Sequence, residues 1–245
     1  MKAATPMRAV ILAAGRGRRM KGLTDDRPKC LIPFRGRTLL AWQLAALRGA
    51  GISDIGIVTG YRSDMLRGQG LAEFHNTRWT ETQMVSSLAC AEPWLRIGNC
   101  IVSYSDIYYE PEAVRLLVES AADLAITYDP NWRALWERRF GDPLLDAETF
   151  RLRADGTLAE IGGKPGSVDE IEGQYMGLLR FTPRGWSEVA RLRENMNATE
   201  RDAMHMTGTL QRVIEAGRVP VHAVPYGAGW GEFDTDQDLR SAGEA

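Results

Sequence analysis

The sequence is poor in the residues that build zinc sites and disulfide frameworks. Its 245 residues include only three cysteines and three histidines, and no Cys-x-x-Cys pair occurs. This argues against a thiolate zinc site and against a fold held together by disulfide bonds. An odd number of cysteines without framework spacing is typical of a reducing compartment, so we predict a cytoplasmic protein.

Long hydrophobic runs and an excess of one charge are also absent. No apolar run approaches the roughly 20 residues needed to cross a bilayer, so we expect no membrane insertion. The apolar stretch 9–14 is short and is followed by Arg16, Arg18 and Arg19, unlike a signal peptide. Lysine and arginine number 30 against 32 acidic residues, and this balance predicts no nucleic-acid partner.

Short apolar runs alternate with amphipathic segments in the first half of the chain, which predicts parallel βαβ units. We expect buried strands at 8–13, 54–59, 99–103, 123–128, 174–181 and 219–224. Helices are expected at 38–49, 82–90, 111–120, 184–197 and 207–216.

No Pro- or Ser-rich linker interrupts the chain, so we predict a single domain over residues 1–245. Residues 1–128 form its predicted nucleotide-binding half, and residues 129–175 a substrate-facing insertion. The turn Ala154-Asp-Gly156 in this insertion predicts a β-hairpin, which we expect to lie on the same sheet. Residues 176–245 are expected to complete the sheet and the metal site considered below.

A glycine-rich, positively charged segment follows the first predicted strand. Gly15 and Gly17 let the backbone approach a ligand closely, and successive N–H groups there can form an anion-binding nest. Three arginines within 16–19 and Lys29 add positive charge, which favours a polyphosphate site, although a solvated basic turn has the same pattern. Met20 stands where a dinucleotide fingerprint needs its third glycine, and no Walker phosphate loop occurs.

Two aspartates lie where metal-dependent chemistry is expected. Asp106 comes just after the strand at 99–103, and open α/β sheets bind ligands at the carboxyl ends of their strands. Asp234 lies in an acid-rich segment far downstream. Mg²⁺ often takes one or two carboxylates, so we predict that both bind it. A helix N-cap is the alternative for Asp234, and Asp236 and Asp238 are predicted to be capping or surface residues.

The glycine segment resembles the signature of the nucleotidyltransferases that activate phosphorylated small molecules. The matching pattern is Leu12-Ala-Ala-Gly-x-Gly-x-Arg-Met20, then Leu23-Thr24, then Pro28-Lys-x-Leu31. The resemblance implies a Rossmann-like α/β nucleotidyltransferase fold. Its mixed, mostly parallel central sheet is flanked by helices and carries a small β-hairpin substrate insertion.

The resemblance also implies roles for individual residues. Arg19 and Lys29 match the family's phosphate-contacting catalytic cations, and Asp106 and Asp234 match its two metal carboxylates. Lys164 matches a lysine that reaches the substrate phosphate, although exposed surface lysine is the commoner fate of this residue type. The implied nucleotide-binding residues are Leu12, Ala13, Ala14, Gly15, Arg16, Gly17, Thr82, Gln83, Ser87 and Asp106.

Further segments resemble the bacterial phosphocholine cytidylyltransferase branch of this family, namely 75–79, 82–88 and 172–177. Gln83 departs from the asparagine usual in that branch, but both amides donate and accept hydrogen bonds. The branch implies a Mg²⁺-dependent cytidylyltransferase. Such an enzyme moves CMP from CTP to a small phosphorylated or phosphonate acceptor, phosphocholine-like, and releases pyrophosphate.

A choline head group would need aromatic faces around its quaternary amine. The aromatic candidates are Tyr108, Tyr109, Tyr128, Trp132, Trp136 and Tyr175, with core packing as the alternative for each. Asp129, Asp142 and Glu172 are candidates to pair with a primary amine instead. The acceptor-binding residues that we predict are Tyr108, Asp129, Trp136, Glu172 and Tyr175.

Two other functions stay open. One is a sugar-1-phosphate nucleotidyltransferase that uses another nucleoside triphosphate. The other is a non-catalytic regulatory or binding subunit on the same fold, which would be expected to lose the phosphate-binding or metal-binding residues that this sequence keeps. Leucine-rich surfaces also leave a homodimer open, although the sequence shows no decisive apolar stripe.

Overall fold

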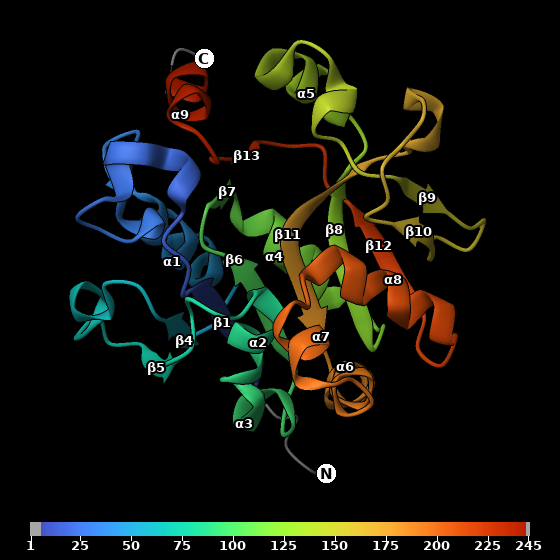
Figure 1. Ribbon diagram of the computed structural model, residues 1–245, viewed down its shortest axis with the longest axis horizontal. Helices are drawn as coiled ribbons and strands as arrows, with labels where there is room; N and C mark the ends of the chain where they lie inside the picture. Colours follow the sequence, from blue (N-terminus) through green and yellow to red (C-terminus); the bar gives the residue numbers. More distant parts are fainter. Residues whose placement is uncertain (1–5, 244–245) are drawn as a thin grey trace.

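In the computed structural model, residues 6–243 are described, and a seven-stranded sheet runs through the middle of them (Figure 1). β11 pairs antiparallel with β6 and β8, and the other neighbouring strands of this sheet are parallel. The mixed, mostly parallel sheet predicted from the sequence is thereby confirmed. In spatial order its strands are β12 (Val221–Pro225), β8 (Leu124–Asp129), β11 (Gln174–Phe181), β6 (Cys100–Tyr104), β1 (Arg8–Ala13), β4 (Asp54–Thr59) and β5 (Ala72–His75).

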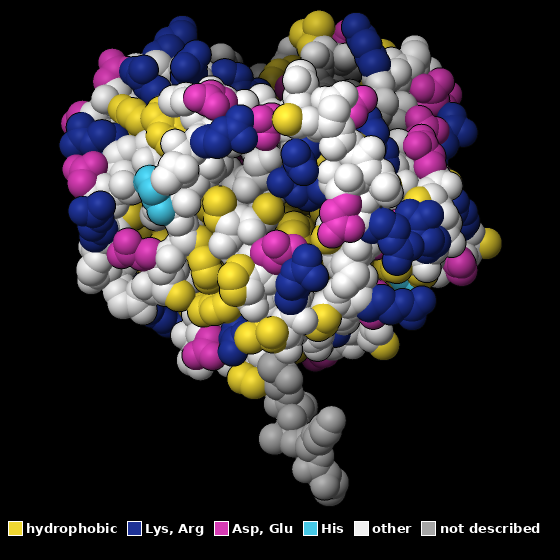
Figure 2. Space-filling model, turned by 60° about the horizontal axis from the view of Figure 1, so that its bottom comes forward, with side chains coloured by type: hydrophobic (Ala, Val, Ile, Leu, Met, Phe, Trp, Pro, Cys, Tyr) yellow, Lys and Arg dark blue, Asp and Glu magenta, His cyan; other side chains and the backbone are white. Residues whose placement is uncertain are grey.

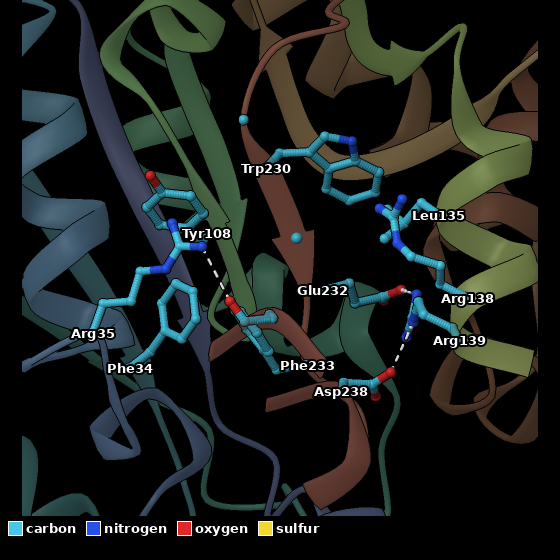
Figure 3. A pocket seen from close by; sticks show the side chains of 13 residues that line it. Phe34, Arg35, Tyr108, Leu135, Arg138, Arg139, Trp230, Glu232, Phe233 and Asp238 are labelled. Atoms are coloured by element: carbon cyan, nitrogen blue, oxygen red, sulfur yellow. Dashed lines mark hydrogen bonds and ion pairs between the residues drawn. The ribbon is translucent and has the colours of Figure 1, made fainter. Parts of the chain in front are cut away.

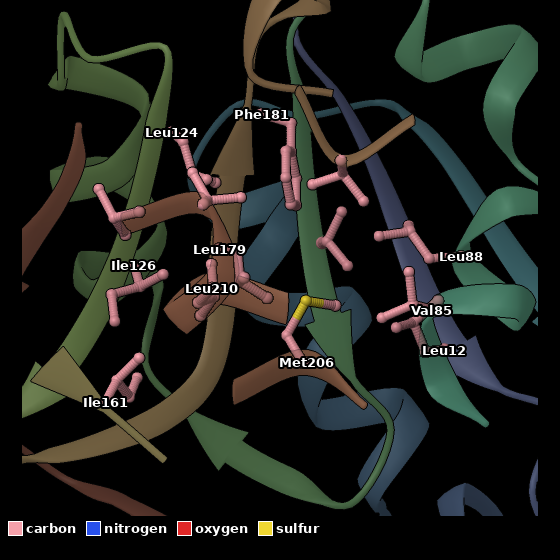
Figure 4. Close-up of a cluster of buried hydrophobic side chains, with 14 of the residues drawn as sticks. Leu12, Val85, Leu88, Leu124, Ile126, Ile161, Leu179, Phe181, Met206 and Leu210 are labelled. Atoms are coloured by element: carbon pink, nitrogen blue, oxygen red, sulfur yellow. The ribbon is translucent and has the colours of Figure 1, made fainter. Parts of the chain in front are cut away.

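Helices cover both faces of this sheet (Figure 1). Side chains alternate along β1, so Ile11 packs into one hydrophobic cluster while Val10 and Leu12 pack into the other. Figure 4 shows the second cluster, in which Val85 and Leu210 from two different helices meet the sheet. The described helices are α1 (Leu39–Gly49), α2 (Met84–Ala89), α3 (Glu92–Leu95), α4 (Pro111–Glu119), α5 (Trp132–Phe140), α6 (Pro183–Glu194), α7 (Ala198–Asp202), α8 (Met206–Ala216) and α9 (Asp236–Gly243).

Three short strand pairs lie outside the main sheet within residues 6–243. β2 (Pro33–Phe34) pairs with β3 (Arg37–Thr38), and β7 (Ile107–Tyr109) pairs antiparallel with β13 (Trp230–Glu232). The predicted hairpin is present as β9 (Phe150–Leu152) and β10 (Leu158–Ile161). The expectation that it lies on the main sheet is wrong, because these two strands form a separate sheet.

Four segments of the described residues differ from the sequence-based expectations. The glycine-rich segment after β1, where no helix was expected, contains a 3₁₀ helix at Arg18–Thr24. The expected insertion also contains α5, and α2 begins at Met84, two residues later than expected. β5 was not predicted, because its residues alternate between half-buried and exposed. No helix within residues 6–243 is long and apolar enough to cross a membrane.

Charged side chains of both signs are interspersed on the face of the molecule shown in Figure 2. This pattern agrees with the near balance of 30 basic and 32 acidic residues in the sequence. No broad area of one sign dominates that face, so surface charge on it gives little long-range attraction for a polyanion.

Thr38 caps α1, the helix that supports the turn between β6 and β7. Its hydroxyl accepts a hydrogen bond from the backbone N–H of Ala41 at 3.1 Å. We expect Thr38→Ala to lower the free energy of unfolding by about 0.5–2 kcal/mol, since an N–H at the helix start loses its partner. Urea denaturation of the variant measures this loss. Thr38→Ser keeps a capping hydroxyl, so its free energy of unfolding should stay within a few tenths of a kcal/mol of the wild-type value. Equal losses in both variants would contradict the capping role.

Candidate active site

The glycine segment after β1 packs directly against Lys29. Gly17 has a φ of +68°, and a Cβ at this position would lie 3.0 Å from the Lys29 Cδ. The Thr24 hydroxyl donates to the Gly17 carbonyl at 3.1 Å, which ties the 3₁₀ helix back to the loop. Glycine is therefore needed here both for the left-handed backbone and for the close approach of the lysine stem.

The short β7–β13 pairing brings together two aspartates that are 128 residues apart in the chain. Asp106 lies in the turn between β6 and β7, and Asp234 follows β13. The Phe233 N–H donates to the Asp106 carbonyl at 3.0 Å, which extends the pairing to the two aspartates. On α1, the buried Gln43 amide donates to the carbonyls of Tyr104 and Ile107, at 2.8 and 2.7 Å. These two bonds fix both ends of the β6–β7 turn that carries Asp106.

Lys29 joins the two carboxylates. Its Nζ lies 2.9 Å from Asp106 Oδ2 and 2.8 Å from Asp234 Oδ1. Burial lowers the pKa of Lys29, but the two carboxylates outweigh it, and the net pKa is raised above its ordinary value. Lys29 is therefore a buried, charged ammonium at neutral pH. Arg19 also reaches Asp234 Oδ1, at 2.9 Å, from a side chain that is 67% exposed.

Asp234 is not the cap of α9, so the alternative considered from the sequence is wrong. The capping hydroxyl is that of Thr235, which accepts from the Asp238 N–H at 3.3 Å. Asp238 in turn accepts from the backbone N–H groups of Asp234 and Thr235, at 2.9 and 2.7 Å. These bonds fix the backbone of Asp234 and leave its side chain free to face Lys29 and Arg19.

Arg139 of α5 adds a third cation beside Asp234, and the sequence analysis did not single it out. It binds Glu232 at 3.0 Å and Asp238 at 2.9 Å, and its Nη2 lies 3.7 Å from Asp234 Oδ2. Its side chain is only 4% exposed. Burial raises the pKa of Glu232 to about 7 and Asp234 adds to the rise, while Arg139 opposes it.

The donor set around Lys29 fits a hard cation with few protein ligands. Asp106 Oδ1 is buried and has no hydrogen-bond partner among residues 6–243. No group of three or more His, Cys, Asp or Glu side chains that could hold a metal occurs within the described part of the chain. Two carboxylates, one with an unused oxygen, are a set that suits Mg²⁺, which completes its shell with water and phosphate.

Six of the predicted nucleotide-binding residues meet at one cavity of about 150 Å³. Trp79 and Met84 complete its lining, and the sequence analysis had assigned neither of them. The buried Asn76 amide donates to the hydroxyls of Thr82 and Ser87, at 2.9 and 3.0 Å, and so orients two of the polar groups. The six are Leu12, Ala14, Gly15, Thr82, Gln83 and Ser87.

The other residues of the predicted nucleotide set lie outside this cavity. Ala13 is buried in the core on the opposite face of the sheet, and Gly17 contacts Lys29. Arg16 pairs with Asp25 at 2.8 Å and lies over the Tyr61 ring at 5.5 Å. The basic loop therefore contains both an ion-paired surface arginine and the cations that reach the carboxylates.

A larger pocket, of about 350 Å³, adjoins the first, and we call it the acceptor pocket. Gln83 and Met84 line both. Asp146, Glu148 and Glu232 give the acceptor pocket an acidic lining that the sequence analysis missed. Its remaining residues are Arg19, Tyr104, Trp136, Gln174, Tyr175, Gly177, His205, Met206, Thr207 and Asp234.

Two acidic residues of this pocket, Asp146 and Glu148, form no ion pair with another residue of 6–243. Burial raises the pKa of Glu148, which also accepts a hydrogen bond from the Thr207 hydroxyl at 3.2 Å. Burial likewise raises the pKa of Asp146, and Arg139 opposes the rise. Asp146 is exposed and forms no ion pair with another residue of 6–243.

The structure brings together only part of the predicted acceptor-binding set. Trp136 and Tyr175 line the acceptor pocket. Tyr108 lines a different pocket, and Glu172 is exposed and accepts from the Leu152 N–H at 2.5 Å. Asp129 is buried and accepts from the Asn131 N–H and the Trp230 indole N–H, at 2.7 and 2.8 Å.

The remaining candidates for amine or phosphate recognition also lie away from the acceptor pocket. Three aromatic candidates are buried in the core, namely Tyr109, Tyr128 and Trp132. This agrees with core packing, the alternative considered for them from the sequence. Asp142 accepts from the Leu144 N–H at 3.0 Å. Lys164 is exposed beyond the end of β10 and lines neither pocket, so its role on a substrate phosphate stays a prediction.

The fold is that of solved nucleotidyltransferases. The CTP:phosphocholine cytidylyltransferase of Streptococcus pneumoniae has the same fold, with a TM-score of 0.74 at 19% identity over 98% of this chain and 99% of that one. The MobA-like NTP transferase domain matches residues 9–175. The chain belongs to this family.

Two curated relatives are more similar in sequence. The chain is 35% identical over 249 residues to the CTP:phosphoglutamine cytidylyltransferase of Campylobacter jejuni, which covers 95% of this chain and 98% of the relative. It is 42% identical over 165 residues to the CMP-5'-(3-aminopropyl)phosphonate synthase of Streptomyces rubellomurinus, which covers 64% of this chain and 24% of the relative. The resemblance inferred from the glycine segment is confirmed.

Proposed function

We propose that the protein transfers CMP from CTP to a small phosphorylated or phosphonate acceptor that carries a positively charged nitrogen, with release of pyrophosphate. The observation that carries this proposal is the convergence of Asp106 and Asp234 on Lys29, close to two adjoining pockets. The smaller pocket would hold the base and the larger one the acceptor. The curated relatives support CTP as the nucleotide, since both are named for cytidylyl compounds.

The chain's own cations would carry most of the catalysis. A phosphate monoester has a charge of about −1.5 to −2 at neutral pH, so it can attack the α-phosphorus without a general base. The obstacle is repulsion between two anions, which positioned positive charge reduces. Lys29 is fixed by two contacts under the glycine loop, whereas Arg19 is exposed enough to move from Asp234 to a phosphate.

We also propose that Asp106 and Asp234 hold Mg²⁺ when CTP is bound. The unpartnered Oδ1 of Asp106 and the small number of carboxylates support this assignment. The ion would supply positive charge at the α-phosphate and hold it in line for the attack. Lys29 contacts both carboxylates and offsets part of their charge, which keeps their side chains in place.

The charge of the acceptor pocket supports an acceptor with a cationic group. Four of its lining residues are acidic, and two of these, Asp146 and Glu148, make no ion pair with another residue of 6–243. Trp136 and Tyr175 add aromatic faces. A phosphorylated amine could place its phosphate near Arg19 and its nitrogen near Glu148. The name of the Streptomyces relative includes an aminoalkyl phosphonate.

An acceptor screen tests the proposal. The enzyme is supplied with CTP and Mg²⁺, and pyrophosphate release is compared for phosphocholine, phosphoethanolamine, 2-aminoethylphosphonate, phosphoglutamine and glucose 1-phosphate. We expect turnover with at least one nitrogen-bearing acceptor and little with the sugar phosphate. Preference for glucose 1-phosphate, or for another nucleoside triphosphate, would favour the sugar-1-phosphate nucleotidyltransferase considered from the sequence. No turnover with any pair would favour a non-catalytic subunit.

Glu148→Gln should weaken acceptor binding while the nucleotide site stays intact. A hydrogen bond to a charged partner is worth about 1.5–3 kcal/mol, so we expect the KM for a phosphorylated amine to rise by about 10- to 100-fold. The KM for CTP should not change, because Glu148 does not line the smaller pocket. Steady-state kinetics of wild type and variant measure both constants; an equal rise in the two would contradict an acceptor-specific role.

Folding provides the control for this variant. Burial raises the pKa of Glu148 above its unfolded value, so the folded state binds this proton more tightly. The resulting contribution to stability is present at low pH and is lost as the pH rises through the raised pKa. Glutamine carries no charge, so the melting temperature of Glu148→Gln at neutral pH should not fall below that of the wild type.

Three further expectations from the sequence also stay predictions. They are the cytoplasmic location, the single domain over residues 1–245 and the homodimer. We propose the first because CTP-dependent activation of a phosphorylated metabolite needs a nucleotide pool. Size-exclusion chromatography with light scattering tests the homodimer directly.

A further inference from the structure

A third pocket, of about 200 Å³, lies next to the acceptor pocket, and we call it the α5–β13 pocket. Glu232 is the residue common to the two linings. Figure 3 shows Phe34 and Tyr108 on one side of the α5–β13 pocket and Leu135 and Arg138 on the other, with β13 between them. Its full lining is Phe34, Arg35, Tyr108, Leu135, Arg138, Arg139, Gly229, Trp230, Gly231, Glu232, Phe233, Asp238 and Ala242.

The walls of this pocket suit a flat apolar group. Phe34 lies against Tyr108 with ring centroids 5.4 Å apart and against Phe233 at 4.7 Å, so the three rings support one another. Trp230 of β13 and Leu135 of α5 complete the apolar walls. Aromatic rings held by their neighbours offer a rigid surface, and a planar ligand can stack there at little entropic cost.

The charge of the pocket is positive. Three arginines and two acids line it, but Glu232 and Asp238 both bind Arg139. Arg138 is exposed and makes no hydrogen bond or ion pair with any other residue of 6–243. A guanidinium that faces an apolar pocket without a partner is a ready binding group for a carboxylate or phosphate.

The pocket is also connected to the proposed metal site. Arg139, held by two residues that line the pocket, extends to 3.7 Å from Asp234 Oδ2. Its Nη2 is buried and makes no hydrogen bond within the described residues. Any shift of Glu232, Asp238 or Arg139 therefore changes the charge and position of the groups around Asp234.

We propose that the α5–β13 pocket binds a small organic anion with a flat apolar body, outside the catalytic pockets, and that its occupation alters turnover through Arg139. Arg138 binds the anionic group, and the aromatic walls bind the apolar body. Contact with the Glu232 and Asp238 carboxylates then displaces Arg139 relative to Asp234. The site is thus regulatory rather than catalytic, and it lies beyond the acceptor chemistry proposed above.

Binding is tested with indole-3-acetate as the probe and tryptamine as the matched cation with the same ring. Isothermal titration should show binding of the first and not of the second, undisturbed by saturating CTP. Arg138→Glu should weaken binding of indole-3-acetate by about tenfold or more. Arg133→Glu is the control, because Arg133 is exposed on the same helix and pairs with Glu137 at 2.9 Å.

Several results would overturn the site. They are absence of binding to the wild type, equal affinity for tryptamine, displacement by CTP, and equal binding by the two arginine variants. These outcomes do not depend on the acceptor and leave the proposed cytidylyltransferase activity untouched. Circular dichroism of both variants should match the wild type, since neither side chain is buried.

Turnover tests the connection to Asp234. With CTP, Mg²⁺ and the best acceptor of the screen, saturating indole-3-acetate should change kcat or the acceptor KM of the wild type by about fivefold. The same addition should leave Arg138→Glu unchanged. Binding without any kinetic change in the wild type would overturn the connection through Arg139.

Discussion

Asp106→Ala is expected to lower kcat by about 10²–10³-fold while the fold stays intact. The variant removes one of two carboxylates from the proposed Mg²⁺ site, and loss of one positioned electrostatic group commonly costs a few kcal/mol in the transition state. The Asp106 side chain is 22% exposed, and among residues 6–243 its carboxylate pairs only with Lys29. Pyrophosphate release under saturating CTP and acceptor measures the loss. Turnover within threefold of the wild type would contradict the metal assignment.

Asp106 is a cleaner target than Asp234. Asp234 is 8% exposed and faces Lys29, Arg19 and Arg139, so its removal takes a carboxylate away from two buried cations and is expected to destabilise the fold. The matched control is Asp236→Ala, which removes a carboxylate whose side chain is 39% exposed and pairs with Arg240 at 2.8 Å. This control should keep turnover near the wild-type value.

Lys29→Met is expected to lower kcat by a comparable factor, about 10²–10³-fold. Methionine fills a similar volume but carries no charge, so the triphosphate loses its fixed cation. The two carboxylates also lose the ammonium between them. Because their attraction outweighs burial and raises the pKa of Lys29, the charged lysine stabilises the folded state at neutral pH, and only pH values above its raised pKa remove this contribution.

A second measurement separates this charge effect from simple unfolding. Without Lys29, the carboxylates of Asp106 and Asp234 face each other, so Mg²⁺ should raise the melting temperature of Lys29→Met more than that of the wild type. Lys21→Met, at an exposed position of the same loop, is the control and should behave as the wild type. An equal Mg²⁺ response in all three proteins would contradict the shared site.

The central strands could be predicted from the sequence because burial on both faces leaves a continuous apolar run. β1, β4 and β11 begin and end where the pattern placed them. β7 and β13 have three residues each and were not predicted, since such short strands have no period of their own. Their pairing exists only through tertiary contact.

The residues of the candidate site likewise fall into those that could be predicted from the sequence and those that could not. The glycine segment and the residues of the small pocket could be predicted because they lie in a dense local pattern matched to a known family. The acidic residues of the acceptor pocket could not, because Asp146 and Glu148 lie between α5 and β9 without a distinctive spacing. Asp129 was a reasonable candidate by sequence, yet its carboxylate accepts from Asn131 and Trp230.

The β7–β13 pairing has a consequence for when activity can appear during synthesis. A nascent chain that has emerged only as far as β12 already contains every strand of the main sheet and the lining of the small pocket. It still lacks Asp234, which follows β13. We therefore expect nucleotide binding and catalysis to become possible at different moments, and a product truncated between β12 and β13 to bind CTP without turning it over.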